Sequence, residues 1–251
     1  MTRWKAASIH FLISLAVLGS LVALVLWRWY PPALFGMAKA GPLLGMIGAI
    51  DLVLGPLLTL VIYRAGKRGL KFDLTVIALV QMAALAYGLW TLWQSRPVYV
   101  VAVEDRFRLV FANEVDAASA ARAIPRFQRM PALGPEWVAA PLPDEPRERL
   151  AAMLDAMNGL DIHMRPDRFQ PYPHAKLPQL LAHAVGERDV LTRSPPDARR
   201  AWADAFADHP GTVMVPLGSS RGSAAVLVAP ATGEVRALVP LDPWPIIDAG
   251  K

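Results

Sequence analysis

The sequence predicts a membrane protein with three transmembrane α-helices followed by an α+β extracytoplasmic domain. Three observations predict this fold class. The apolar residues concentrate in the first part of the chain, in three runs long enough for a helix to cross a bilayer. The excess of Lys and Arg lies at the flanks of these runs. After residue 97 the pattern changes to short apolar runs between turn residues, which is typical of a folded domain.

The predicted spans cover about residues 6–27, 42–63 and 74–93, within a transmembrane region 1–97. About 20 apolar residues match a hydrocarbon core of roughly 30 Å, and a helix satisfies its own backbone there. The first run could also be a cleaved signal peptide. We favour a span, because the run is longer than the apolar core of such a peptide and ends in WRWYPP rather than in small residues.

The charge distribution predicts the orientation. Residues 1–97 carry nine Lys and Arg against two acidic residues, whereas residues 98–251 carry 17 against 19. The basic excess therefore flanks membrane spans and does not indicate a nucleic-acid partner. The N-terminus and the loop 64–73 are the more basic flanks, so the positive-inside rule places them in the cytoplasm. The domain 98–251 then lies in the periplasm of a Gram-negative bacterium.

Asp51 is the most informative residue of the second span. A carboxylate at mid-span costs about 2.5–3.5 kcal/mol on insertion scales, so it normally faces protein or water. Counting from the predicted helix ends places Ser20 and Tyr87 at a similar depth as expected hydrogen-bond donors, with His10 and Gln81 nearer the cytoplasm. Three interpretations stay open: Asp51 joins the bundle together, it meets a partner helix, or it belongs to a proton or ion path.

The second span also predicts a close helix contact and a kink. Small residues let helices approach one another, and they recur here at Gly41, Gly45, Gly48 and Ala49. Gly55 and Pro56 follow, and a proline removes one backbone hydrogen bond and bends a helix. A groove beside the kink could hold a foreign helix, or it could seat the first or third span.

The domain pattern predicts strands at both ends and helices between them. The expected strands are 98–105, 108–115, 212–218, 224–230 and 234–240. The expected helices follow Asp116, run from Pro146 to Asn158, and cover 176–185 and 196–207. The second of these helices places Leu150, Met153, Leu154 and Met157 on one face. The Pro-rich segment 131–146 predicts an ordered loop or linker.

The sequence contains no recognisable catalytic or metal-binding motif. The chain has no cysteine, and His163, His174, His183 and His209 have no metal-ligand spacing, so we expect surface histidines. GSSRGS (218–223) lacks both the nucleophile elbow and the phosphate-loop pattern, and a hairpin turn is expected. We therefore expect no enzyme activity, no metal and no cofactor.

Several segments together resemble a known family, the TfpX/TfpZ-type type IV pilin accessory proteins. They are RWKAASIHFLISL, WYPP, DLVLGPLLTLVIY, KFDLTVIALVQMAALAYGLW, RPVYVVAVEDRF and LVPLDPW. The resemblance follows the whole chain in order and is most specific in the membrane half. It implies a non-catalytic, chaperone-like protein of the bacterial inner membrane that assists a type IV pilin before or during assembly.

The implied partners are a type IV pilin and membrane lipid, and the oligomeric state stays open. As hypotheses for pilin binding we name Asp51, Gly48, Gly55 and Pro56 inside the membrane and, at its outer boundary, Trp29, Tyr30, Pro31 and Pro32. The alternative is a membrane-anchored periplasmic sensor or ligand-binding subunit of a larger complex. The short cytoplasmic segments disfavour it, because they leave no room for an output domain. A tethered hydrolase would need catalytic motifs that the sequence lacks.

Overall fold

The computed structural model describes residues 2–174 and 177–249. The chain divides into two compact units. The first, which we call the helix unit, comprises Met1–Tyr30 and Lys39–Ser95. The second, the domain unit, comprises Pro31–Ala38 and Arg96–Lys251. Each unit is described by itself below.

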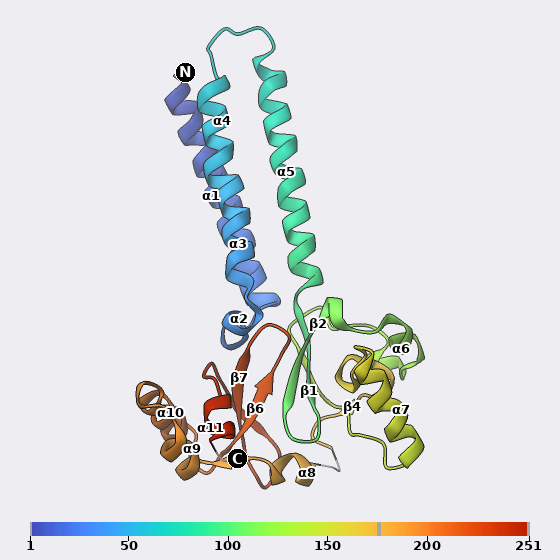
Figure 1. The fold of residues 1–251 in the computed structure, drawn as a ribbon. Helices are drawn as coiled ribbons and strands as arrows, with labels where there is room; N and C mark the ends of the chain where they lie inside the picture. Colours follow the sequence, from blue (N-terminus) through green and yellow to red (C-terminus); the bar gives the residue numbers. More distant parts are fainter. Residues whose placement is uncertain (1, 175–176, 250–251) are drawn as a thin grey trace. The chain divides into compact units, whose positions relative to one another are not determined.

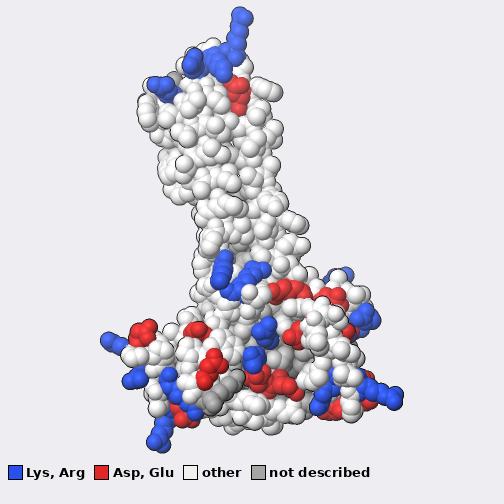
Figure 2. Space-filling model, in the orientation of Figure 1, with Lys and Arg blue, Asp and Glu red and all other residues white. Residues whose placement is uncertain are grey.

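The helix unit consists of three long apolar helices (Figure 1). They are α1 (Arg3–Arg28), a continuous helical stretch over Ala40–Ile62, and α5 (Leu70–Gln94). The middle stretch consists of α3 (Ala40–Ala49), the π-helical segment η1 (Ile50–Leu54) and α4 (Gly55–Ile62). All three helices are long and apolar enough to cross a membrane, which makes them candidate spans by length and composition. Figure 2 shows Lys and Arg gathered at one end of this unit, next to a long surface without charge.

Local interactions explain why the helices begin where they do. The Thr2 side chain accepts a hydrogen bond from the Lys5 backbone N–H at 3.3 Å and caps α1. Gly69, with a φ of 82°, precedes α5, and Lys67 pairs with Asp73 at 2.6 Å across this start. The third helix therefore begins four residues before the predicted start, because polar residues at its end belong to the helix as well.

The domain unit is an α/β domain built on one curled, mixed sheet. Along the sheet the strands run in the order β4-β3-β1-β2-β6-β7-β8, and β5 pairs with β6. The neighbours β1 and β3 are parallel, as are β2 and β6, and the remaining pairs are antiparallel. The strands are β1 (Pro97–Ala102), β2 (Phe107–Phe111), β3 (Glu136–Ala139), β4 (Gln170–Pro171), β5 (Val185–Gly186), β6 (Val213–Gly218), β7 (Ser223–Val228) and β8 (Val235–Val239).

Helices and short 3-10 turns connect and cover these strands. The helices are α2 (Pro32–Ala38), α6 (Ala117–Arg122), α7 (Pro146–Met157), α8 (Leu177–Ala182), α9 (Glu187–Arg193), α10 (Pro196–Asp208) and α11 (Trp244–Asp248). The 3-10 turns are η2 (Ala112–Glu114), η3 (Pro125–Phe127), η4 (Ile162–Met164) and η5 (Pro166–Arg168). Asp116 caps α6 by accepting from the Ser119 N–H at 2.7 Å, as the sequence predicts.

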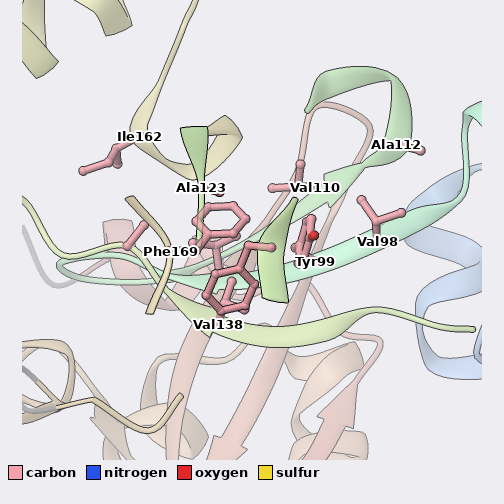
Figure 3. Packing of buried hydrophobic residues seen from close by; sticks show 11 residues of the cluster. Val98, Tyr99, Val110, Ala112, Ala123, Val138, Ile162 and Phe169 are labelled. Carbon is pink, nitrogen blue, oxygen red and sulfur yellow. The ribbon is translucent and has the colours of Figure 1, made fainter. Parts of the chain in front are cut away.

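Two apolar clusters stabilise the sheet. In the first, residues of β1, β2 and β3 pack against the segments that follow them, and the Tyr99 and Phe169 rings meet edge to face at 5.0 Å (Figure 3). In the second, Trp202 and Phe206 of α10 pack on β6 and β7, and both are almost fully buried. Every residue of β1 is buried, which is typical of a central strand covered on both faces.

The structure departs from the predicted elements in the middle of the domain. The Pro-rich segment contains β3, which pairs with β1 from Tyr99↔Glu136 to Ala102↔Ala139. The predicted helix 176–185 is the shorter α8, since Val185 belongs to β5, and Lys176 lies outside the described residues. The sequence did not predict α9. The hairpin turns at 218–223 and around Gly233 are confirmed by the β6–β7 and β7–β8 pairings.

Candidate functional site

Asp51 lies in the π-helical turn η1, and its side chain is buried, with 6% of its surface exposed. The wide turn has a local cause. The Gly55 N–H donates to the Ile50 carbonyl, five residues back, rather than to the Asp51 carbonyl. The next residue, Pro56, has no N–H to donate. The Asp51 carbonyl is therefore left without a donor from its own helix, and the irregularity predicted at Gly55 and Pro56 takes the form of this turn.

Gln81 of α5 supplies the missing donor. Its amide Nε2 donates to the Asp51 carbonyl oxygen at 3.4 Å and to the Asp51 Oδ1 at 3.5 Å. The amide reaches this position because residue 55 is a glycine. A Cβ on Gly55 would stand 2.0 Å from Gln81 Nε2 and 2.6 Å from its Cδ. The absence of a side chain at Gly55 thus lets Gln81 of α5 donate a hydrogen bond to the Asp51 carbonyl.

The donors expected from depth counting were wrong. Ser20 donates to the Ala16 carbonyl of its own helix at 2.8 Å, and 65% of the Tyr87 surface is exposed. The error has a physical reason, because α5 begins at Leu70 rather than at residue 74. Gln81 then lies eleven residues into its helix, and Asp51 lies eleven residues before the end of α4 at Ile62, so the two share one depth.

A cavity of about 150 Å³ adjoins this pair within the helix unit. Polar side chains of all three helices contribute to it: His10, Ser14, Asp51 and Gln81. The His10 Nδ1 lies 2.6 Å from the Thr59 hydroxyl, which is itself buried. Apolar side chains complete the lining: Ile13, Val17, Ala78, Met82 and Leu85. His10 belongs to the same site as Asp51, although the sequence argument placed it nearer the helix end.

Pro56 lines a second feature, an apolar groove of about 510 Å³ along α1 and the η1–α4 stretch. Its other lining residues are Trp4, Ala7, Ser8, Phe11, Leu12, Leu52, Val53, Leu57 and Leu60. Val53 and Leu57 are among the exposed side chains of this groove. Gly48 lies outside it, and a Cβ on Gly48 would meet the Leu18 side chain at 3.5 Å, an ordinary contact. Gly48 therefore faces α1.

The four boundary residues are divided between the two units. Trp29 meets Trp93 edge to face at 5.0 Å within the helix unit. Tyr30 is 1% exposed, and its hydroxyl donates to the Leu92 carbonyl at 3.0 Å. Its side chain is thus occupied in joining α1 to α5 and is covered in this structure. Pro31 and Pro32 belong to the domain unit, where Pro32 is the first residue of α2.

Within the domain unit, α2 packs beside the β6–β7 turn. Leu34 is fully buried, and the Arg221 guanidinium donates to the Ala38 carbonyl at 3.4 Å while lying 3.7 Å over the Phe111 ring. A Cβ on Gly222 would approach the Met37 carbonyl oxygen to 3.2 Å, so this turn passes close to the backbone of α2. The sequence predicted the turn 218–223 but not that α2 packs against it. The apolar run ALFGMA after WYPP is a signal for a packed segment, but not for the turn against which it packs.

The helix α7 forms as predicted, but none of its residues is buried. Its four apolar side chains are exposed to between 50% and 83%: Leu150, Met153, Leu154 and Met157. Ion pairs hold its polar side instead, with Arg165 on Asp155 at 2.5 Å and Arg168 on Glu148 at 3.0 Å. The apolar face is therefore open surface on the domain unit.

The histidines do not gather into a metal site. The described residues contain no group of three or more His, Asp or Glu side chains placed to hold a metal ion. His163 corrects the expectation of a surface histidine, because 4% of its surface is exposed. Its Nδ1 lies 3.3 Å from the Asp161 carboxylate, and this hydrogen bond lowers the pKa of Asp161.

Comparisons with known proteins find three similar proteins of Dichelobacter nodosus. A fimbrial assembly protein of serogroup I is 32% identical over 171 residues, which are 67% of this chain and 66% of that protein. One of serogroup E1 is 31% identical over 171 residues, which are 67% of this chain and 66% of that protein. One of serogroups C1 and C2 is 34% identical over 114 residues, 44% of this chain and 86% of that protein. The chain thus spans slightly less than two thirds of the first two relatives. No family model and no solved structure matches it.

Proposed function

The chain belongs to the family of fimbrial assembly proteins, and we propose that it is a non-catalytic accessory protein that binds a type IV pilin and supports its stability or its assembly into pili. The family membership carries this proposal. The resemblance of its membrane segments to the TfpX/TfpZ type supports the narrower assignment. Its three apolar helices support a membrane location.

We place the protein in the bacterial inner membrane, with the N-terminus in the cytoplasm and the domain unit in the periplasm. The basic residues at the start of α1 and between α4 and α5 support this orientation. Fusions of a reporter that works only in the periplasm, joined after Asp116 and within the loop 64–69, test it. Activity of the loop fusion alone would contradict the orientation.

The helix unit provides the contact that we assign to the pilin's membrane segment. The apolar groove at Pro56 has the length of about two helical turns along α1 and the η1–α4 stretch, since its lining runs from Leu52 to Leu60. In a bilayer, lipid fills such a groove when no helix does, so its apolar surface alone is no driving force. A partner helix in this groove would therefore be selected by close packing against its lining residues.

Site-specific photocrosslinking in cells that make the pilin tests the proposal. A photoreactive amino acid at Val53 or Leu57 should capture the pilin, identified by its mass. The matched control is Leu79 on α5, which is as exposed as Val53 (64% against 62%) but does not line the groove. Capture of the pilin from all three positions, or from none, would contradict binding in the groove.

The exposed face of α7 is the second place to probe. The same photoreactive residue at Leu150 or Met157 separates contact through the domain unit from contact through the helix unit. Capture of the pilin there would extend the proposal to the periplasmic part. If positions on both units instead recover a transporter or kinase subunit, the alternative function as a sensor or ligand-binding subunit would replace the proposal.

A further inference from the structure

The cavity beside Asp51 contains more hydrogen-bonding capacity than the helix unit uses. Its walls carry the Asp51 carboxylate, the Gln81 amide oxygen and the Ser14 hydroxyl. Asp51 is buried, and its only hydrogen-bond partner among the described residues is the Gln81 amide, at the long distance of 3.5 Å. Because the Gln81 Nε2 is directed to Asp51, the amide oxygen remains an acceptor. Ser14 Oγ has no hydrogen bond to a described residue.

The charge of the cavity selects the kind of occupant. Among the residues that line it, Asp51 has the only acidic side chain, and none is Lys or Arg. His10 is the other titratable group, and its Nδ1 is engaged by Thr59. A buried carboxylate without a cationic partner is costly in a low-dielectric environment, so a positive group would be drawn to it. A negative group would meet Asp51 and be repelled.

The size of the cavity and its lining residues further limit which chemical groups could occupy it. A volume of about 150 Å³ holds a small organic group, since one water takes about 30 Å³. Ile13, Val17, Met82 and Leu85 give the cavity apolar walls, which suit an alkyl stem better than the shell of a hydrated metal ion. Asp51 lies roughly 16 Å along the helix from Ile62, so an amine in a lipid headgroup does not reach it.

We propose that this cavity is a receptor for an ammonium group carried on an apolar, membrane-embedded segment of a partner protein. Asp51 accepts the charge, Gln81 and Ser14 complete its hydrogen bonds, and the apolar walls hold the stem. For the identity of the partner, the pilin, this inference rests on the proposed function. It explains why Asp51 lies beside open space rather than against a second buried polar group.

Synthetic single-span peptides that differ at one central residue test the inference without any pilin. The purified full-length protein in lipid nanodiscs is titrated with fluorescent peptides that carry Lys, Leu or Glu at mid-span. We expect the Lys peptide to bind about tenfold more tightly than the Leu peptide, a difference of about 1.4 kcal/mol. The Glu peptide should bind no better than the Leu peptide.

Variants then locate the binding. Asp51→Asn should reduce the Lys-to-Leu ratio to within about twofold, and Ala78→Phe, which fills the cavity but keeps the carboxylate, should do the same. Leu79→Ala, outside the cavity, should retain the wild-type ratio. Equal binding of the Lys and Leu peptides to the wild-type protein overturns the inference, as does a ratio that both Asp51→Asn and Ala78→Phe leave unchanged. Either variant suffices if the other does not fold.

The ammonium receptor and the pilin as partner can be refuted independently of each other. If the Lys peptide is preferred but no pilin co-purifies with the tagged protein in mild detergent, the cavity is an ammonium receptor and the proposed partner is wrong. If the pilin is captured but the Lys and Leu peptides bind equally well, the pilin remains the partner and the ammonium receptor is refuted.

Discussion

Replacing Gly55 by Ala tests whether Gln81 completes the wide turn of the second helix. The new Cβ would stand 2.0 Å from Gln81 Nε2, closer than real contacts allow, so the amide must swing away. The Asp51 carbonyl then loses its donor at 3.4 Å, and neither Gly55 nor Pro56 can replace it. The substitution therefore acts through Gln81 on α5. Its effect can be separated from a local backbone effect by changing Gln81 as well.

The expected magnitude follows from two opposed effects. A buried carbonyl without a donor costs about 1–3 kcal/mol. Alanine in place of glycine favours a helix by about 0.8–1.0 kcal/mol. In the wild-type background Gly55→Ala should therefore destabilise the helix unit by between about 0 and 2 kcal/mol. In a Gln81→Ala background the donor is already gone, and the same substitution should stabilise by about 1 kcal/mol.

Equilibrium unfolding of the four proteins in mixed detergent micelles measures this coupling. Wild type, Gly55→Ala, Gln81→Ala and the double variant form one thermodynamic cycle. We expect an interaction energy of about 1–3 kcal/mol and a change of sign between the two backgrounds. Additivity within about 0.5 kcal/mol would show that Gly55 and Gln81 act independently and would refute the reasoning.

Three further predictions concern single contacts. Tyr30→Phe removes the bond to the Leu92 carbonyl and should cost about 1 kcal/mol in the same unfolding assay, and an unchanged midpoint would contradict a structural role. Burial raises the pKa of Tyr99 to about 12 from 10.0, so the unfolded chain loses this proton first. Stability should fall between pH 10 and 12, less steeply in Tyr99→Phe, by circular dichroism. The hydrogen bond from His163 lowers the pKa of Asp161 below 3.8, so the stability it contributes above that pH is lost on acidification. Asp161→Asn should show a shallower acid transition, and an identical one would contradict this.

Apolar run length predicted the three helices well, because a long uncharged segment has few other stable structures. It did not predict their ends. The start of α5 depends on Gly69 and on the Lys67–Asp73 pair, and both lie outside the apolar run. An error of four residues corresponds to about one helical turn, and it was enough to direct the search for a partner of Asp51 to Tyr87 rather than to Gln81.

The domain unit was predictable where contacts are local and not where they are distant. The hairpins β6–β7 and β7–β8 follow from alternating strands and short turns. The pairing of β1 with β3 joins segments more than 30 residues apart, and the Pro-rich composition around β3 concealed a strand. The contact between α2 and the β6–β7 turn joins Ala38 to Arg221, which are 183 residues apart in the sequence. A local sequence pattern cannot predict a contact over such a separation.

The exposed face of α7 shows a different limit. Leu150, Met153, Leu154 and Met157 have the spacing of a helix that packs on a core, and the helix forms over the predicted residues. Periodicity identifies a common face but does not say what covers it. In this structure that face is open, so the same pattern that usually indicates a core indicates here a surface to be probed.

Recovery of the pilin with the tagged full-length protein in mild detergent measures the proposed binding of a type IV pilin. We expect the pilin to co-purify with the wild-type protein. We expect Asp51→Leu to lower the recovery of the pilin while the protein itself remains as abundant and as monodisperse as wild type. Wild-type protein that recovers no pilin from cells that produce it, or undiminished recovery with Asp51→Leu, would contradict the account.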